Sequence, residues 1–283
     1  MGYSWLPIIA VRLRLLPHAP ILLAPRGECA APAQAVRAWK KRIARRLLRG
    51  LLPKTLTWHA SSDREVGEVR LWLSSRRERN ASFVVATDPA PPPLDSASAG
   101  SGEPVPRIVF LSRIHPIKGL LEGIKAFTNV LSECTFTIHG VIEDEDYWDR
   151  CLIALGALPP NISWRYSGNY VPSEASSILS AADALLLPTK SENFCRVIAE
   201  ALSVGCPVLV PDTTPWTPVI EEGAGIVLWD GGSITAALEG LGHLGVQERV
   251  KWRTGALAAY ARWYENHRRD FSPFARLAPG VNQ

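Results

Sequence analysis

The fold of this chain is decided by Ala184-Leu185-Leu186-Leu187-Pro188 and by the segment Ser191-Glu192-Asn193-Phe194-Cys195-Arg196-Val197-Ile198-Ala199-Glu200 that follows it. An apolar run of strand length ends at a proline, and a polar loop then leads into a segment with helical periodicity. One glutamate lies in the loop, and the second lies eight positions later in the expected helix. This pattern is typical of a buried strand that passes through a loop into a helix.

The two glutamates have two interpretations. Eight residues of helix cover about 12 Å, which is close to the length of an extended sugar–diphosphate–ribose unit. In the first interpretation, Glu192 binds sugar hydroxyls, Glu200 binds ribose hydroxyls, and a diphosphate lies between them near the positive N-terminus of the helix. In the second, the segment is an ordinary junction between a strand and a helix, and both glutamates face water.

From Arg107 onward, short apolar strands alternate regularly with helical segments. We expect strands at 107–111, 135–139, 162–166, 184–187, 207–210 and 225–228. We expect helices near 117–132, 144–156, 173–182, 194–204, 233–244 and 248–268. This alternation predicts an α/β fold whose parallel sheet is covered on both faces. Ligands of such sheets bind beyond the carboxyl ends of the strands, where Glu192 lies.

The first part of the chain predicts a smaller α/β segment, with strands at 21–24, 55–59 and 83–86. The stretch Ser61-Ser62-Asp63-Arg64-Glu65 has cap residues ahead of a helix that ends near Leu73. Residues 88–106 are rich in Pro, Ser, Ala and Gly without periodicity, which is typical of a linker. We therefore expect a partial domain at 1–87, a linker at 88–106, a complete domain at 107–265 and a C-terminal tail at 266–283.

The composition is that of a globular protein, because 47% of the 283 residues are apolar and 20% are charged. The five cysteines are scattered without a Cys-x-x-Cys pair, which favours reduced thiols over a disulfide framework or a zinc site. No apolar stretch reaches the roughly 18 residues of a membrane span, and Arg12 and Arg14 interrupt the first candidate. We expect a soluble protein in the cytoplasm.

Basic charge is concentrated near the beginning of the chain. Residues 1–106 hold 16 Lys and Arg against 8 Asp and Glu, whereas the remaining residues hold 15 against 19. Residues 37–49 combine seven basic residues with apolar residues at three- and four-residue steps, which predicts an amphipathic basic helix. Such a helix binds the inner face of an anionic membrane or a phosphate-bearing partner, or it packs as an ordinary surface helix. The acidic second part argues against a nucleic-acid-binding protein.

A second candidate element follows the first strand of the large domain. The sequence Ser112-Arg113-Ile114-His115-Pro116-Ile117-Lys118-Gly119 places two cations five residues apart across a turn that contains proline. Arg113 offers a planar fork and Lys118 offers a point charge, and the two together suit a diphosphate. Taken alone, the same residues are also typical of solvated charges on a loop.

The motifs occur in one order along the chain. This order is Arg113 with Lys118-Gly119, then Gly140, then Gly168 with Tyr170 and Val171, then Glu192 with Glu200, and last Gly205-Cys206-Pro207. Over residues 107–265 the series resembles the sugar-nucleotide-binding domain of family-four retaining glycosyltransferases (glycosyl transferases group 1), which have the GT-B fold. Residues 24–28 and 59–62 resemble the later part of that family's N-terminal, acceptor-side domain, so we expect a complete C-terminal and a partial N-terminal Rossmann-like domain.

The resemblance implies a reaction and a role for each matched residue. A glycosyl group would pass from a nucleotide sugar to an acceptor hydroxyl with retention, in polysaccharide or glycoconjugate synthesis, without metal, cofactor or protein nucleophile. Arg113 and Lys118 would neutralise the departing diphosphate, and Glu192 would bind the transferred sugar. Glu200 would bind the ribose. The other donor-binding residues that the resemblance implies are Gly140, Tyr170, Val171, Asn193, Phe194 and Cys195.

Two departures from the family pattern bear on these expectations. Cys195 lies where the family usually has glycine, so a side chain would crowd the close approach of backbone to sugar. We also expect the acceptor-side domain to be shorter than in the family, without a good counterpart of the histidine that these enzymes commonly present to the acceptor. His18 lies between prolines and His59 lies at a strand end, so we expect both to be structural or exposed.

Two hypotheses of function therefore stay open. The first is a retaining glycosyltransferase with a reduced acceptor domain. The second is a catalytically weak or truncated donor-binding module that needs a partner chain to complete its cleft. The expected partners are a nucleotide sugar, with UDP- and GDP-linked hexoses as the leading candidates, and a glycan or lipid-linked acceptor. No residue signature identifies the base, the sugar or the acceptor.

Overall fold

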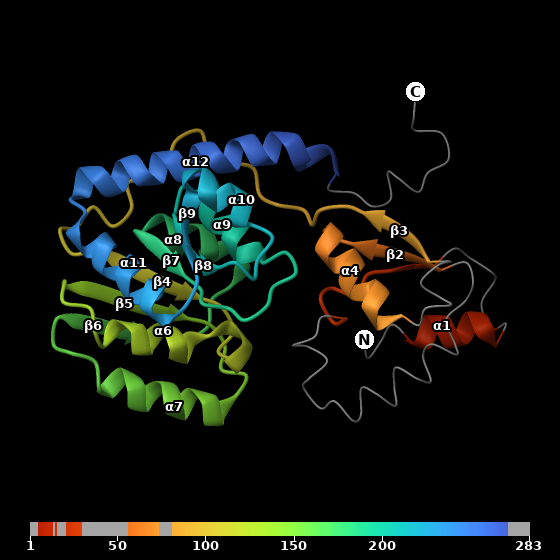
Figure 1. The fold of residues 1–283 in the computed structure, drawn as a ribbon, viewed down its shortest axis with the longest axis horizontal. Coiled ribbons are helices and arrows are strands. Elements are labelled where there is room, and N and C mark those ends of the chain that lie inside the picture. The colour runs from red at the N-terminus through yellow and green to blue at the C-terminus, as the bar shows by residue number, and fades with distance from the viewer. Residues whose placement is uncertain (1–4, 14, 16–20, 30–55, 74–80, 271–283) are drawn as a thin grey trace. The chain divides into compact units, whose positions relative to one another are not determined.

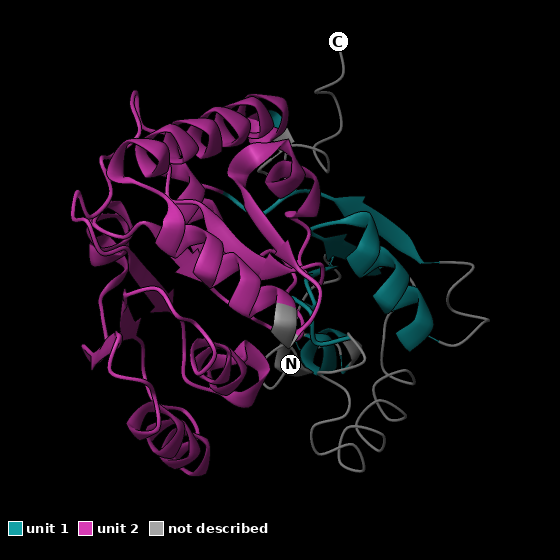
Figure 2. Ribbon diagram, turned by 60° about the vertical axis from the view of Figure 1, so that its left-hand side comes forward, with its two compact units in different colours: residues 1–89, 269–283 teal, residues 90–268 magenta. Residues whose placement is uncertain are grey.

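The computed structural model describes residues 5–13, 15, 21–29, 56–73 and 81–270. The chain divides into two compact units, of which unit 1 comprises residues 1–89 and 269–283 and unit 2 comprises residues 90–268 (Figure 2). The basic helix expected at 37–49 lies outside the described residues, and so does His18. Each unit is an α/β body with its own core.

Unit 1 contains a small parallel sheet among its described residues. Its strands are β1 (Ile21–Leu23), β2 (Leu56–Ala60) and β3 (Ser82–Val85), in the order β1-β2-β3. Its described helices are α1 (Trp5–Arg12) and α4 (Asp63–Trp72). Ser62 caps α4, since its hydroxyl accepts a hydrogen bond from the Glu65 amide at 3.3 Å. The strands, the helix and its cap follow the sequence prediction closely.

Unit 2 is built on a six-stranded sheet in which neighbouring strands are parallel. The strands are β4 (Arg107–Leu111), β5 (Cys134–His139), β6 (Ile162–Tyr166), β7 (Ala184–Leu186), β8 (Val208–Pro211) and β9 (Gly225–Leu228). They lie in the order β6-β5-β4-β7-β8-β9. The chain therefore winds from β4 to one edge of the sheet and then from β7 to the other, as in doubly wound α/β folds.

Helices form a layer on each side of this sheet (Figure 1). They are α6 (Leu120–Phe127), α7 (Glu145–Gly156), α8 (Ala175–Ser180), α9 (Arg196–Ser203), α10 (Thr217–Val219), α11 (Gly231–His243) and α12 (Val246–His267). Short 3-10 helices lie at Pro116–Lys118, Pro172–Glu174 and Arg268–Asp270, and a π-helical turn lies at Ile220–Ala224. Helix α6 packs with α7 and α11, whereas α9 packs with α8 and α12.

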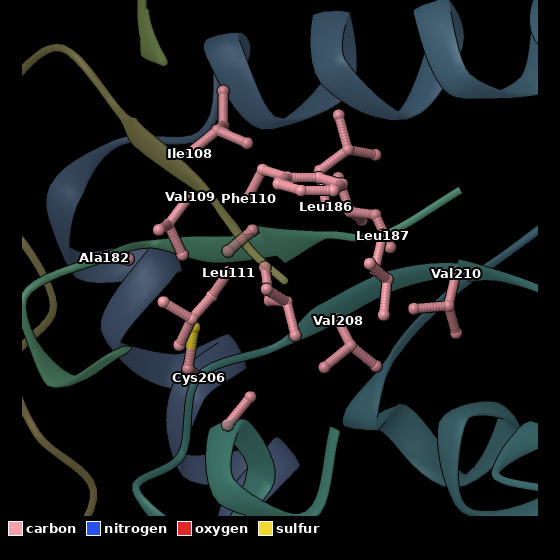
Figure 3. Packing of buried hydrophobic residues seen from close by; sticks show 14 of the residues in the cluster. Ile108, Val109, Phe110, Leu111, Ala182, Leu186, Leu187, Cys206, Val208 and Val210 are labelled. Carbon is pink, nitrogen blue, oxygen red and sulfur yellow. The ribbon is translucent and has the colours of Figure 1, made fainter. Parts of the chain in front are cut away.

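The core of unit 2 is made mainly by the central strands. Phe110 and Leu111 of β4 are fully buried beside Leu186 of β7 and Val208 of β8 (Figure 3). Because helices cover both faces of these strands, successive side chains are apolar instead of alternating with polar ones. This burial fixes where the strands end, and it therefore fixes the start of the loops at their carboxyl ends.

The sequence suggested a linker at 88–106, and residues 90–106 of it are packed as part of unit 2. The guanidinium of the fully buried Arg253 in α12 donates from Nε to the Ser98 carbonyl at 2.7 Å. The buried carboxylate of Asp183 accepts a hydrogen bond from the Ser101 hydroxyl at 2.5 Å. Since a buried charge needs hydrogen-bond partners in place of water, these contacts hold the segment against the unit.

Two helices begin later than the sequence predicted, because left-handed residues precede them. The helix expected at 117–132 is interrupted at Gly119, whose φ is 73°. The helix expected at 194–204 begins only at Arg196, since Cys195 has φ 60° and ψ 72°. A residue in this conformation cannot continue a right-handed helix. The predicted boundaries at these two places were therefore wrong.

Candidate functional site

The strand order of unit 2 reverses between β4 and β7. The chain leaves β4 for β5 on one side, whereas β7 begins the run toward β8 and β9 on the other. The loops after these two neighbouring strands, residues 112–119 and 187–195, start from the same point at the carboxyl edge of the sheet. In open α/β sheets this reversal point is where ligands bind.

The two loops bring Lys118 and Glu192 into contact. Lys118 Nζ lies 2.6 Å from Glu192 Oε1, and the two side chains are only 13% and 9% exposed. Opposite charges attract strongly where water is largely excluded, although both lose hydration on burial. The contact joins the cation expected to face a diphosphate with the carboxylate expected to bind a sugar. The sequence pointed to both residues but not to their contact.

Backbone contacts hold the same two loops together. The Ile117 carbonyl accepts hydrogen bonds from the Lys190 amide at 2.8 Å and from the Thr189 hydroxyl at 3.1 Å. A Cβ atom on Gly119 would lie 1.9 Å from the carbonyl oxygen of Pro188. Only glycine permits this approach, so the contact between the two charged side chains depends on it.

Arg113 does not join this pair. Its terminal nitrogen lies 2.8 Å from each carboxylate oxygen of Glu143, in the loop after β5. The Arg113 and Glu143 side chains are 56% and 35% exposed, so water screens their attraction and the pair is weak. The role of Arg113 toward a diphosphate stays a prediction. Glu143 carried no signal in the sequence, because its contact depends on two loops that are 30 positions apart.

Gly140 lies where the loops after β4 and β5 approach each other. A Cβ atom there would lie 1.8 Å from the Ser112 carbonyl oxygen. The Gly140 carbonyl accepts a hydrogen bond from the Tyr166 hydroxyl at 2.9 Å, and its amide donates to the Gly168 carbonyl at 2.8 Å. Gly140 therefore shapes the edge of the sheet. Val171, in the loop after β6, is exposed.

Tyr170 and Glu200 lie close enough to influence each other. Burial raises the pKa of the Tyr170 hydroxyl, and the negative charge of Glu200 raises it further. Burial also raises the pKa of the Glu200 carboxyl, while the positive charge of Arg196 opposes this shift. The Glu200 carboxylate is thus poorly hydrated, and hydrogen-bond donors from a ligand would stabilise its charged form.

Cys195 occupies a left-handed position immediately before α9. An L-residue in this conformation costs roughly 1–2 kcal/mol, whereas glycine adopts it freely. Burial, and after it the charge of Glu192, raises the pKa of the buried thiol well above its ordinary value. Cys195 is therefore a neutral thiol and not a nucleophile. Phe194 is buried beside it, and Asn193 is half-buried.

The turn after β8 supplies two residues that the sequence did not single out. The Thr213 hydroxyl donates to the Thr189 carbonyl at 2.9 Å, and the indole N–H of Trp216 donates to the Phe194 carbonyl. The turn thus holds the loop 187–195 at two places. No local pattern marks these residues, because their partners lie more than 20 positions earlier in the chain.

Other features of the described residues complete this account. His59 is buried, with Nε2 2.9 Å from the Ala86 carbonyl, which agrees with a structural role.

In the part of the chain that the structure describes, no group of His, Cys, Asp and Glu side chains is arranged to hold a metal ion. Within the same ranges, no helix is both long and apolar enough to cross a membrane. All five cysteines are buried and free of disulfide bonds.

Residues 105–244 match the sequence model of the family of glycosyl transferases group 1. A sequence search of curated proteins finds no match. Anabaena Alr3699/HepE in complex with UDP and glucose has a similar structure, with a TM-score of 0.68 and 15% identity over 95% of this chain and 71% of that chain. WaaG, a glycosyltransferase involved in lipopolysaccharide biosynthesis, has a TM-score of 0.69 and 14% sequence identity, and the match covers 98% of this chain and 82% of that chain. Sucrose-phosphate synthase from Thermosynechococcus elongatus has a TM-score of 0.62 and 17% sequence identity, and the match covers 92% of this chain and 70% of that chain.

Residues 105–244 are therefore similar to glycosyl transferases group 1, over just under half of the chain. At such low identity the structural likeness shows the fold, which is the α/β fold of GT-B glycosyltransferases with Rossmann-like parallel sheets. The fold class expected from the sequence is therefore confirmed. The segment that matches the family begins two residues before β4 and ends directly after α11, so it contains every residue predicted to bind the donor.

Proposed function

We propose that this chain is a glycosyltransferase that takes its sugar from a nucleotide-sugar donor. The observation that carries the proposal is the buried pair of Lys118 and Glu192 at the point where the strand order reverses. A cation and a carboxylate at this point match the two parts of such a donor, its diphosphate and its sugar hydroxyls. The family match over residues 105–244 and the structures of HepE with UDP and with UDP-glucose support the same class of donor.

In the proposed reaction, the bond between the anomeric carbon and the diphosphate oxygen breaks. The nucleoside diphosphate leaves with the bonding electrons, while an acceptor hydroxyl bonds to the anomeric carbon and passes its proton to the departing diphosphate oxygen. Lys118 exchanges Glu192 for the diphosphate, and Arg113 turns from Glu143 toward the same phosphates, so both stabilise the leaving group. Glu192 then accepts hydrogen bonds from the sugar, and Glu200 accepts them from the ribose. Retention without a metal ion or a protein nucleophile is part of this proposal.

The remaining donor contacts belong to the loops at the same edge of the sheet. The backbone amides of Asn193, Phe194 and Cys195 line the sugar, while Tyr170 and Val171 approach the nucleotide and Gly140 keeps the edge open to it. UDP and GDP are the proposed nucleotides, and the proposed acceptors are glycans or lipid-linked sugars of polysaccharide synthesis.

A thermal-shift screen of UDP, GDP and ADP, each with and without its sugar, tests the donor class. A ligand present at 100 times its dissociation constant adds about 2.7 kcal/mol to stability, which is readily detected. We expect stabilisation by at least one nucleotide sugar. Stabilisation by none of them would contradict the proposal.

Calorimetry on two variants tests the division of roles. Glu200→Gln should weaken binding of the bare nucleoside diphosphate by about 1–2 kcal/mol, because a charge-assisted bond to ribose becomes a neutral one. Glu192→Gln should leave that binding unchanged or strengthen it, because Lys118 loses a competing partner. The same variant should weaken binding of the sugar nucleotide. Equal losses for the bare diphosphate in both variants would show that the assignment is wrong.

The alternative, a donor-binding module that needs a partner chain, differs from the enzyme in a transfer assay. A chain that binds a nucleotide sugar and also glycosylates a soluble or lipid-linked acceptor by itself is the enzyme. A chain that binds the donor equally well but transfers only after a second protein is added is the module. Donor binding alone therefore does not decide between the two.

We also propose that residues 37–49, which lie outside the described residues, bind an anionic membrane surface and keep the protein at the cytoplasmic face. Each of the seven basic residues in this range contributes about 1 kcal/mol of attraction to such a surface. The chain should sediment with vesicles that contain phosphatidylserine at low salt and should be released as salt rises. Absent or salt-independent binding would contradict this part of the proposal.

A further inference from the structure

The carbonyl of Phe194 has a partner that none of the donor-binding assignments includes. The indole N–H of the buried Trp216 donates a hydrogen bond to it, and the two aromatic rings lie 5.3 Å apart. Both residues belong to loops at the carboxyl edge of the sheet, after β7 and after β8. This is a contact between a buried side chain and the backbone of the loop that carries Glu192.

Trp216 is itself held by an aromatic cluster on α12. Its ring lies 4.5 Å from the ring of Trp263 and 6.2 Å from the ring of Tyr260. Its backbone amide donates to the Thr214 hydroxyl at 3.3 Å. Aromatic rings packed at these distances restrict one another strongly. The indole N–H therefore has a fixed direction, and so does the carbonyl that accepts its hydrogen bond.

The direction of that carbonyl decides where the next amide points. The carbonyl of Phe194 and the N–H of Cys195 belong to one planar trans peptide, so they point in opposite directions. With the carbonyl turned into the aromatic cluster, the amide of Cys195 points away from it. No described residue accepts a hydrogen bond from that amide. Since backbone donors normally have a partner, this N–H is available to a ligand.

We infer that Trp216 is a positioning residue, which holds the peptide between Phe194 and Cys195 so that the Cys195 amide faces the sugar of the bound donor. The inference rests on the proposed function, because it explains why the Cys195 amide, one of the proposed donor contacts, points toward the sugar. It goes beyond that function, because Trp216 is not among the proposed donor-binding residues.

The chain offers a matched control for Trp216. Tyr260 lies in the same aromatic cluster, is fully buried, and donates its hydroxyl to the backbone carbonyl of Pro91 at 2.6 Å. Trp216→Phe and Tyr260→Phe each keep an aromatic ring and remove one buried donor to a carbonyl. Only the first removes a bond to the loop 187–195. It also removes more buried volume than the second, so a loss of positioning is distinguished from a cavity by comparing the sugar nucleotide with the bare diphosphate.

The first measurement is hydrogen exchange without ligand, in the peptide that spans 193–200. The Ile198 amide in this peptide donates to the Cys195 carbonyl at 3.0 Å and reports on the first turn of α9. Exchange should be faster in Trp216→Phe than in the unchanged chain and in Tyr260→Phe. Equal exchange in the two variants would overturn the inference, whether or not the chain binds a nucleotide.

The second measurement compares the affinity for UDP-glucose or GDP-mannose with the affinity for the corresponding bare diphosphate. Trp216→Phe should lose about 3–10-fold for the sugar nucleotide, the range of one hydrogen bond, and less than twofold for the diphosphate. Tyr260→Phe should show no such difference. If the two ligands lose affinity equally in Trp216→Phe, the inference is wrong while donor binding stands. If the unchanged chain binds neither ligand, the proposed function and the positioning role both fail.

Discussion

Gly119 is the residue whose replacement tests most directly how the site is assembled. It has φ 73° and lies between Lys118 and α6, and an alanine Cβ there would lie 1.9 Å from the Pro188 carbonyl oxygen. Gly168 is a matched control, since its φ is 79° but a Cβ there would meet nothing within 4 Å. Gly119→Ala and Gly168→Ala therefore impose the same backbone strain, and only the first also forces two loops apart.

The magnitudes of the two changes differ accordingly. In Gly168→Ala the left-handed conformation costs about 1–2 kcal/mol of folding free energy. The lower entropy of the unfolded chain offsets about 0.4–1 kcal/mol of this, so the net loss of stability is about 1 kcal/mol. Gly119→Ala adds the displacement of a close-packed backbone, about 1–3 kcal/mol. It also weakens the two hydrogen bonds to the Ile117 carbonyl, each worth about 1 kcal/mol. We therefore expect a total loss of about 3–5 kcal/mol.

Urea denaturation followed by tryptophan fluorescence measures these losses, and binding of a nucleotide sugar measures their consequence for the site. For a body of this size each kcal/mol lowers the melting temperature by about 2–4 °C, so the two variants are easily separated. Gly119→Ala should also lose donor binding, because Lys118 moves away from Glu192. Equal losses of stability in the two variants would refute the reasoning that close approach at Pro188 assembles the site.

Glu143→Gln should strengthen binding of a nucleoside diphosphate about threefold in calorimetry, since it releases Arg113 from an exposed ion pair; unchanged affinity would contradict a phosphate role for Arg113. Cys195→Gly should be no less stable than Cys195→Ala, because relief of about 1–2 kcal/mol of strain offsets the lost burial of a methyl group, about 0.8 kcal/mol. Burial raises the pKa of Glu200, so this carboxylate is protonated at a higher pH than an ordinary glutamate. Nucleotide affinity should therefore begin to fall at that higher pH on acidification, and Glu200→Gln should abolish this part of the pH profile.

The strands of unit 2 could be predicted to within one residue at each end. For the central strands β4, β7 and β8 the reason is that burial of both faces makes each of them a nearly uninterrupted apolar run. The placement of Lys118 and Glu192 at one edge followed from the same pattern, since parallel strands direct their following loops to one edge. The starts of the helices at Leu120 and Arg196 could not be predicted. They depend on left-handed residues, and for Cys195 the residue type itself argues against that conformation.

The contacts that support the site were beyond prediction for a different reason. Trp216 binds the loop after β7, and Arg253 binds the segment before β4 across 155 positions of sequence. Neither residue is part of a periodic pattern that distinguishes it from its neighbours. A tryptophan after a strand and an arginine in a long helix are each typical of many environments, and only the packing of α12 against α9, α10 and the turn at Ile220–Ala224 gives them partners.

The contact between Lys118 and Glu192 has a consequence for the order of events at the site. A buried ion pair that loses one partner leaves an uncompensated charge, which is strongly unfavourable. A bare nucleoside diphosphate can replace Glu192 as the partner of Lys118, but it offers nothing to Glu192. A nucleotide sugar replaces both partners, since its hydroxyls donate to the carboxylate while its phosphates accept from the ammonium. In the proposed reaction the pair would therefore favour the donor over the product, so loss of the sugar by transfer would itself weaken the hold on the diphosphate and promote its release.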